Sequence, residues 1–316
     1  MLSKLDYGLR VALGVTLLSL NTLVHTPVLF VATLFRLILP FEAARNRMRR
    51  MLGAIAESWI GFNSWMVDTL TTTQIELEGE LPDHPKGQYL VICNHQSWAD
   101  IPILQKLFNR RLPLLRFFLK SQLIWVPLLG PAWWALDFPF MKRYSKEQIA
   151  RKPQLTGRDI AATKKACEKF RTLPVALMNF VEGTRFEPDK HARQNSPYQH
   201  LLKPRSGGVA FVLETMGESI DTLLDVTIVY SLSRPSLADL FANRIRQIRV
   251  SLRTLEIPER FRRMNHSDDE QKQAFRTWIN DLWREKDLTV GRLKAQISGE
   301  EWTPANWKSS LPRSDC

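Results

Sequence analysis

His95 and Asp100 combine the residue types and the spacing that general-base chemistry needs. They lie in the segment NHQSWAD, residues 94–100, directly after the apolar run YLVIC, which predicts a buried strand. Near pH 7 a neutral imidazole can accept a proton from a hydroxyl, and a carboxylate bonded to its other nitrogen fixes the tautomer. A histidine at a strand end and an aspartate one helical turn later can approach each other. The other interpretation is a helix-capping or surface pair, because this spacing often arises by chance.

A second polar segment follows another apolar run. Residues 175–181, VALMNFV, predict a strand, and residues 182–186, EGTRF, follow it as a turn that contains glycine. Between the two polar segments lie FFLKSQL (117–123) and FPFMKR (138–143), and after them come LLKPRSGG (201–208) and an apolar run over 223–230.

These segments together resemble the glycerolipid acyltransferase family, whose best-known member is 1-acylglycerol-3-phosphate acyltransferase. In that family the first segment reads NHxSxxD and the second xEGTR, and their order and separation fit this chain. The likeness covers roughly residues 75–230. The chain departs from the pattern at Val181, where proline is frequent, and at Asp225, inside the last apolar run.

The resemblance implies transfer of an acyl group from acyl-CoA or an acyl carrier protein thioester to the sn-2 hydroxyl of a lysophospholipid. The acceptor that it implies first is 1-acylglycerol-3-phosphate, which would give phosphatidic acid. Acylation of another lysophospholipid, as in phospholipid remodelling, is the alternative. No cofactor beyond the thioester co-substrate is expected, and the expected partners are membrane phospholipid and lysophospholipid.

The resemblance also implies roles for residues of the weaker segments and of the turn. Lys120 and Arg185 would line a phosphate site, while Glu182, Gly183 and Thr184 would shape the acceptor pocket. The side-chain chemistry agrees, since arginine offers a planar bidentate fork and lysine a point charge.

Other interpretations of the basic residues stay open. Arg185 could instead form an ion pair with Glu182 that only braces the turn. Arg143 and Arg205 are weaker candidates for phosphate contact.

Acyl transfer to an alcohol needs a base, a group that orients the base, and donors for the developing oxyanion. His95 and Asp100 would supply the first two, and backbone amides of the turn at Gly183 could supply the third. Cys93 could be considered a nucleophile, but strand alternation predicts that it packs into the sheet. We therefore expect direct attack by the acceptor hydroxyl. A thioester hydrolase and a catalytically idle lipid-binding protein are the alternatives.

Composition excludes some classes of protein. The chain has 316 residues, of which 44% are hydrophobic and 24% charged, so it can bury a core and is not disordered. A net charge of +12 requires an anionic partner: nucleic acid, a phospholipid surface or a phosphorylated substrate. Nucleic acid is disfavoured because helix-turn-helix, zinc-finger and aromatic RNA-binding patterns are absent from the sequence. The three cysteines and the histidines have no disulfide or metal-binding spacing, so no metal is expected.

The pattern along the chain predicts an α/β fold with a mixed sheet flanked by helices and an N-terminal membrane-associated helical segment. We expect strands near 74–80, 89–93, 116–119, 136–141, 175–181 and 224–230, and helices near 98–108, 156–171 and 207–216. Residues 247–255 predict a further strand, most simply a solvated edge strand. A helix after Asp268 is expected to pack on the domain.

The N-terminal residues predict a membrane anchor. Residues 11–35 are long and apolar enough to span a bilayer, and basic residues on both sides permit both ends to lie at the cytoplasmic face. Pro27 could bend this segment so that it re-enters one leaflet; the alternative is a single span. Residues 54–70 predict a helix whose apolar face meets either the membrane interface or the catalytic domain.

These patterns divide the chain into three parts. We expect anchoring helices over residues 1–70, an acyltransferase α/β domain over 71–297 and a loose tail over 298–316.

Overall fold

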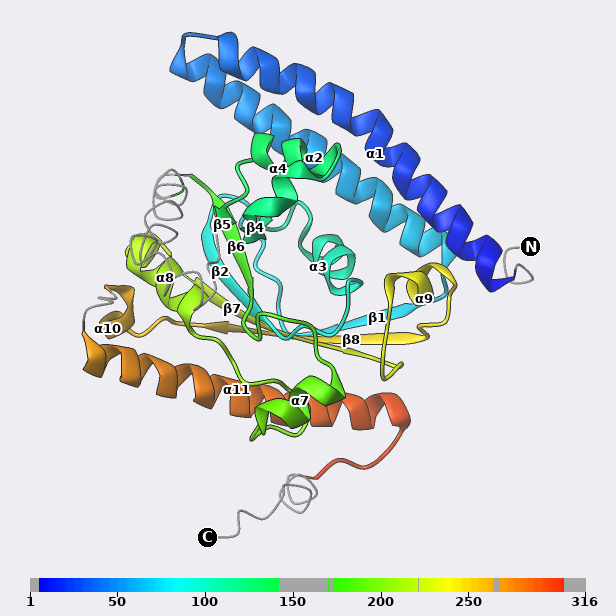
Figure 1. Ribbon diagram of the computed structural model, residues 1–316, viewed down its shortest axis with the longest axis vertical. Helices are drawn as coiled ribbons and strands as arrows, with labels where there is room; N and C mark the ends of the chain where they lie inside the picture. Colours follow the sequence, from blue (N-terminus) through cyan, green and yellow to red (C-terminus); the bar gives the residue numbers. More distant parts are fainter. Residues whose placement is uncertain (1–5, 142–169, 171–172, 221, 264–267, 304–316) are drawn as a thin grey trace, which may run out of the picture.

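The computed structural model describes residues 6–141, 170, 173–220, 222–263 and 268–303, and its centre is a mixed six-stranded sheet (Figure 1). The strand order is β1-β8-β7-β2-β6-β3. Neighbouring strands are parallel except β7 and β8. The strands are β1 (Gln74–Glu78), β2 (Gln88–Cys93), β3 (Leu115–Phe117), β6 (Val175–Phe180), β7 (Thr222–Tyr230) and β8 (Gln247–Leu255). The predicted α/β class is therefore confirmed.

Helices cover both faces of the sheet, and the central strand β2 shows how it separates two cores. Leu90 and Ile92 belong to the core beneath α8 (Gly207–Met216) and α11 (Asp269–Ser298). Tyr89, Val91 and Cys93 belong to the core on the side of α3 (Asp100–Phe108). Because successive strand residues point to opposite faces, a continuous apolar run fills both cores.

The helix α11 lies along one face of the sheet, as Figure 1 shows. It begins after Asp268, whose side chain accepts the Gln271 amide hydrogen, and it buries Phe275, Ile279 and Trp283 in the core. The prediction that this helix packs on the domain is confirmed.

The prediction of a solvated edge strand over 247–255 is wrong. β8 pairs with β1 on one side and β7 on the other, so β1 is the edge strand. Ile248, Val250 and Leu252 are buried, as the alternation indicated, but Ser251 on the opposite face is buried too. The error arose because alternation along a strand reports which faces are covered, whereas its neighbours in the sheet depend on distant segments.

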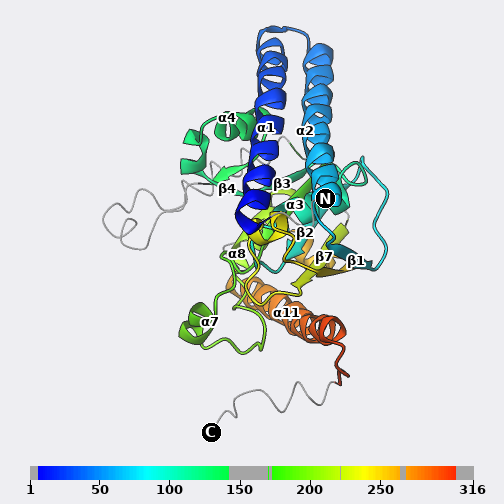
Figure 2. The same cartoon turned by 90° about the vertical axis from the view of Figure 1, so that its right-hand side faces the viewer.

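Two long helices precede the sheet and run antiparallel to each other (Figure 2). They are α1 (Tyr7–Ile38) and α2 (Glu42–Leu70). Asn21 of α1 donates to Asn63 of α2 at 2.8 Å, which pairs two buried amides between the helices. α2 buries one face against α1 and α3, which confirms the packing interpretation of residues 54–70.

The chain does not turn back at Pro27. α1 continues through this proline, and the reversal occurs between Ile38 and Glu42. A proline inside a helix removes one backbone hydrogen bond, and here the contacts with α2 and the rest of the helical ladder keep α1 continuous.

Short elements complete the described chain. They are the two-stranded sheet β4 (Leu119–Lys120) with β5 (Phe140–Met141), the 3₁₀ helix η2 (Ser121–Trp125), α4 (Leu129–Ala135), α7 (Pro188–Gln194), α9 (Leu237–Phe241) and α10 (Glu259–Arg262). The strands expected near 116–119 and 136–141 are thus shorter than predicted. The helix expected near 156–171 lies, apart from Phe170, outside the described residues.

Candidate functional site

The side chains of His95 and Asp100 meet at the carboxyl end of β2. His95 Nδ1 lies 2.7 Å from Asp100 Oδ2, and the His95 side chain is 14% exposed while that of Asp100 is fully buried. The same Oδ2 accepts the amide hydrogens of Gln96 and Ser97 at 2.8 and 3.0 Å. A carboxylate held this firmly fixes the orientation of the imidazole ring and can stabilise its protonated form.

Tyr230 completes the set of donors around Asp100. Its hydroxyl donates to Asp100 Oδ1 at 2.6 Å, and the whole side chain is buried at the end of β7. Burial and the neighbouring Asp100 charge raise the pKa of Tyr230 well above its usual value, so the phenol stays protonated and donates. Sequence reasoning missed this residue. Its only signal was a phenol at the last position of an otherwise apolar run.

Two neighbours fix the position of His95. Asn94 donates to the Ile228 carbonyl and accepts the Ile228 amide hydrogen, both at 2.9 Å, which ties the end of β2 to β7. The His95 ring stacks on Phe180 with ring centroids 3.9 Å apart, and Phe180 stacks in turn on Phe117. The imidazole therefore lies at the carboxyl end of β2, the strand between β7 and β6 in the middle of the sheet.

Glu182 points into the protein and braces the backbone of both polar segments. It is 1% exposed and accepts the amide hydrogens of His95 and Leu202 at 3.2 and 3.3 Å. Burial raises the pKa of Glu182 to about 8 despite these two hydrogen bonds. It forms no ion pair with Arg185 within the described part of the chain, so that alternative interpretation of Arg185 is wrong.

The turn after Glu182 depends on Gly183. This residue has φ +68°, and a Cβ there would lie 3.1 Å from Arg205 Cδ, so the turn favours glycine. The Gly183 amide donates to the Phe180 carbonyl at 2.8 Å and is therefore not free to hold an oxyanion, whereas the expectation for the other amides of this turn stays a prediction. Thr184 Oγ1 accepts from Lys190.

Arg185 lies at the surface over the ring of Trp98, at 5.1 Å from the ring centroid. It lines a hollow of about 280 Å³, here called the Arg185 hollow, whose walls combine two arginines with two carboxylates. The lining residues are Gln96, Arg185, Phe186, Glu187, Pro188, Asp189, Ser233, Arg234 and Pro235. Phe186 also donates its amide hydrogen to the His95 carbonyl at 2.7 Å, which joins the hollow to the His95 segment.

The other predicted cations are not gathered in the same way. Lys120 is exposed at the end of β4, three residues after Phe117, whose ring lies in the stack beside His95. Arg205 packs against Gly183 and donates its amide hydrogen to Val181 at 2.7 Å. Arg143 lies outside the described residues.

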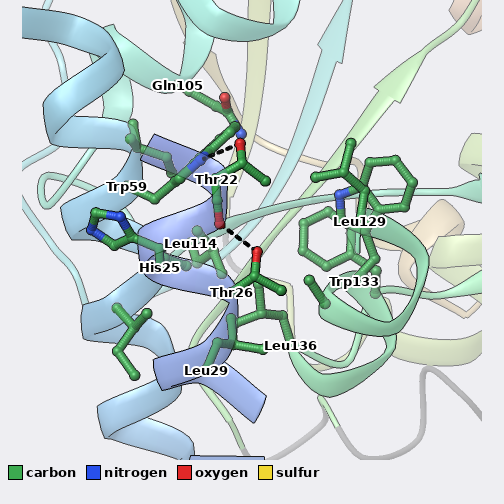
Figure 3. Close-up of a pocket in the computed structure, with 15 residues that line it drawn as sticks. Thr22, His25, Thr26, Leu29, Trp59, Gln105, Leu114, Leu129, Trp133 and Leu136 are labelled. Atoms are coloured by element: carbon green, nitrogen blue, oxygen red, sulfur yellow. Dashed lines mark hydrogen bonds between the residues drawn. The ribbon is translucent and has the colours of Figure 1, made fainter. Parts of the chain in front are cut away.

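Two apolar spaces lie between the sheet domain and the helices α1 and α2. One is a pocket of about 70 Å³, shown in Figure 3, where Leu129 and Trp133 of α4 face Thr22 and Thr26 of α1. The other is a groove of about 210 Å³, here called the Trp98 groove. It is lined by Leu18, Trp59, Asn63, Met66, Val67, Trp98, Ile101, Pro102, Gln105, Leu237, Leu240 and Phe241. Trp98 thus lines the apolar groove and also contacts Arg185, a residue of the polar hollow.

A family model described as Acyltransferase matches residues 74–231, which is half of the chain and contains both polar segments. The chain belongs to this acyltransferase family. A 28% identical relative is an uncharacterised acyltransferase of Saccharomyces cerevisiae, with 64% of this chain and 58% of the relative covered. The mouse 1-acyl-sn-glycerol-3-phosphate acyltransferase epsilon is 23% identical, with coverages of 81% and 71%. The yeast 2-acyl-1-lysophosphatidylinositol acyltransferase is 26% identical, with coverages of 66% and 62%.

The similarity covers only part of the length of these relatives. The chain spans between 58% and 71% of the length of those three relatives. Among solved structures, the 1-acyl-sn-glycerophosphate acyltransferase PlsC from Thermotoga maritima superposes with a TM-score of 0.52 at 15% identity. The superposition covers 94% of this chain and all of that one, so the two acyltransferases share a fold that includes the N-terminal helices.

Proposed function

We propose that this acyltransferase moves an acyl group from an acyl-CoA or acyl carrier protein thioester to the hydroxyl of a lysophospholipid. The observation that supports this most directly is the 2.7 Å contact between His95 and a fully buried Asp100 at the carboxyl end of β2, next to a polar hollow that contains two arginines; apolar spaces lie elsewhere in the same domain. A base, an anion-binding surface and room for alkyl chains are what this reaction requires.

In the proposed reaction His95 takes the proton of the acceptor hydroxyl through Nε2. The oxygen then attacks the thioester carbon, the carbon–sulfur bond breaks, and the imidazolium returns the proton to the departing thiolate. Asp100 holds Nδ1 throughout, and Tyr230 and two backbone amides hold Asp100. Cys93 is not the nucleophile, because it is fully buried and burial raises the pKa of its thiol well above the usual value.

Arg185 is the proposed main contact for the acceptor phosphate. The Trp98 ring contacts its guanidinium, and the side chain is exposed, so its N–H groups are accessible to a phosphate. Arg234 of the same hollow is a second cation that sequence reasoning did not identify. Lys120, which does not line the hollow, and Arg143, which is outside the described residues, remain proposed contacts, while Glu182 shapes the site by holding the backbone of His95.

The acceptor alkyl chain is assigned to the Trp98 groove, because Trp98 lines this groove and its ring lies against Arg185 of the hollow. α1 is the one helix among the described residues that is long and apolar enough to cross a membrane. We propose that it anchors the enzyme to the cytoplasmic leaflet, so that the acceptor reaches the groove without leaving an apolar environment.

Two acceptors are proposed. The first is a 1-acylglycerol-3-phosphate, whose acylation gives phosphatidic acid, because its phosphate group can bind the arginines of the hollow. A lysophospholipid with a hydroxyl-bearing headgroup is the second candidate, because Glu187 and Asp189 line the same hollow and can accept hydrogen bonds from hydroxyls. The yeast relative that is named for lysophosphatidylinositol supports this second candidate.

A lipid-class assay tests the proposal. Purified enzyme is given a panel of lysophospholipids with either acyl-CoA or acyl carrier protein thioester, and new diacyl product and free fatty acid are both measured. Acceptor-dependent product is the expected result. Free acid formed equally without acceptor would identify a hydrolase, and absence of both products would overturn the enzymatic proposal.

Saturation curves for the separate substrates test the hollow. Arg185→Met should weaken acceptor use roughly tenfold and change donor use little, since one exposed charge-assisted contact contributes about 1.4 kcal/mol. Arg193→Met is the matched control, because this exposed arginine on α7 does not line the hollow. Equal damage to both substrates would contradict the phosphate assignment.

A further inference from the structure

The segment from Ser121 to Ala135 has an unusual surface for a part of the catalytic half of the chain. It contains η2 and α4, and no charged residue occurs between Lys120 and Asp137. No residue of η2 is buried. Trp125 is 85% exposed, the largest fraction among the exposed large apolar residues, and Trp134 is 49% exposed. Two tryptophans on an uncharged, exposed surface are unfavourable in water and typical of a membrane interface.

This surface belongs to an ordered turn. The amide of Gly130 donates to the Val126 carbonyl at 2.8 Å, and that of Leu129 donates to Pro127 at 2.7 Å. A Cβ at Gly130 would lie 2.1 Å from the Ile124 carbonyl oxygen, so η2 and α4 pack closely at this glycine. The exposed side chains are therefore held in place by the backbone.

The same turn shields an apolar pocket with its inner face. Trp133 and Leu129 line the pocket between α1, α2 and α4 that Figure 3 shows. Trp134, the next residue along the helix, is half exposed on the other side. α4 is thus apolar on both faces, and the part of the chain that the structure describes covers only one of them.

The outer face is continuous with the exposed side of α1. Arg36 near the end of α1 donates to the Ala135 carbonyl at 3.0 Å and pairs with Asp137 at 3.1 Å, which joins the end of α4 to the helix. The exposed large apolar residues of α1 run along its length and include Leu20, Leu23, Val24, Val28, Val31, Leu34, Phe35, Leu37 and Ile38. In Figure 2 α4 lies beside α1, whereas α11 lies at the far side of the sheet.

We infer that Ser121–Ala135 is a second membrane-contacting element, which lies in the lipid interface beside α1 with Trp125 and Trp134 at the level of the headgroups. Lipid fits this surface better than a protein partner, because the segment adjoins a helix with the length and composition of a membrane span, and tryptophan is enriched at membrane interfaces. The inference goes beyond the proposed acyl transfer and does not depend on it.

The first experiment places an environment-sensitive fluorophore on single cysteines in the full chain, after replacement of Cys167 and Cys316 by serine. Trp125→Cys probes the segment, Val24→Cys probes the exposed side of α1, and Gln273→Cys probes α11 on the opposite face. The proteins are bound to vesicles of phosphatidylcholine and phosphatidylglycerol that carry a quencher on the acyl chain near the headgroup.

The expected result is quenching at Trp125→Cys that matches Val24→Cys and exceeds Gln273→Cys several-fold. Quenching at Trp125→Cys no greater than at Gln273→Cys would overturn the inference. The inference would also be overturned if the fluorescence of this label changed with protein concentration in the absence of vesicles, because that would identify a contact between copies of the chain.

The second experiment measures sedimentation with the same vesicles. The double variant Trp125→Ser with Trp134→Ser should bind roughly tenfold more weakly at high salt, where apolar contacts dominate. Gln122→Ser, a change of an exposed polar residue in the same segment, should leave binding unchanged. Equal binding of the double variant and the control would contradict the inference.

Discussion

Two buried carboxylates, Asp100 at the start of α3 and Asp225 on β7, differ in how their charge is balanced. Asp100 accepts hydrogen bonds from Tyr230, from two backbone amides and from His95, and none of these partners except the imidazole can carry a positive charge. Asp225, on β7, contacts two permanent cations, Lys286 of α11 and Arg253 of β8. Both carboxylates are at most 1% exposed.

The difference separates a site that can exchange a proton from one that only stabilises the fold. The charge on Asp100 can be matched by a proton that arrives at His95 during a reaction, and the imidazole remains partly open to the surface. Asp225 instead has two basic partners within the folded protein, Arg253 and the fully buried Lys286, which also donates to the Val226 carbonyl at 2.6 Å. Burial of a carboxylate therefore indicates function only together with the identity of its partner.

The strongest way to test the contrast is to remove the reactive partner. His95→Ala should lower turnover by about 10²–10⁴-fold with little change in the free energy of unfolding, because proton transfer is lost while the packing of the sheet remains. The turnover of Asp100→Asn should be lowered by a factor in the same range. Steady-state rates on protein checked by urea unfolding measure this, and near-normal turnover in a folded variant would remove His95 from the mechanism.

The opposite result is expected at the other carboxylate. Lys286→Met should lower the free energy of unfolding by about 3–5 kcal/mol, the usual cost of removing one partner of a buried pair, and leave turnover per folded molecule nearly unchanged. Lys272→Met, on the same helix and in a surface pair with Asp269, should change stability by less than about 1 kcal/mol. A selective loss of turnover in Lys286→Met would show that the two carboxylates are coupled.

Tyr230 offers a finer test of how Asp100 is held. Tyr230→Phe keeps the ring and removes one hydrogen bond to a carboxylate. The loss of unfolding free energy and the loss of transition-state stabilisation should together amount to about 1.5–3 kcal/mol. Turnover and unfolding measured on the same preparation separate the two contributions. A loss of turnover as large as that of His95→Ala would mean that the phenol takes part in proton transfer.

Glu182 is a third buried carboxylate, and pH should reveal its state. Its pKa is raised to about 8 in the folded protein, above the ordinary value of 4.5, so its protonated form favours folding. The stability that it contributes is present below pH 4.5 and is lost as the pH rises through about 8. Glu182→Gln should remove a slope of at most about 1.4 kcal/mol per pH unit from the unfolding free energy over this window. Identical slopes in urea midpoints of the two proteins would contradict the raised pKa.

The local sequence pattern predicted most of the secondary-structure elements and indicated that His95 and Asp100 can approach each other. Alternation and apolar runs predicted the helix over 207–216 and the strand over 247–255 with the observed bounds. The spacing of His95 and Asp100 at the junction of a strand and a helix permitted their contact, the family resemblance favoured it, and the structure confirms it. The resemblance over residues 75–230 agrees with the family match over 74–231.

Contacts between distant segments were decided only by the tertiary structure. Tyr230 reaches Asp100, and Asp225 meets Lys286, across many intervening residues, so no spacing along the chain could indicate either contact. The place of β8 inside the sheet and the reversal after α1 are of the same kind.

The sequence by itself determined most of the elements, the α/β class and the proximity of His95 and Asp100, the pair proposed to be reactive, because short-range sterics, hydrophobic periodicity and local spacing are properties of neighbouring residues. Which buried carboxylate would be reactive, and which surface would stay apolar and exposed, depended on the order of strands and the packing of helices. Those are set by the balance of burial over the whole chain, and only the folded structure expresses it.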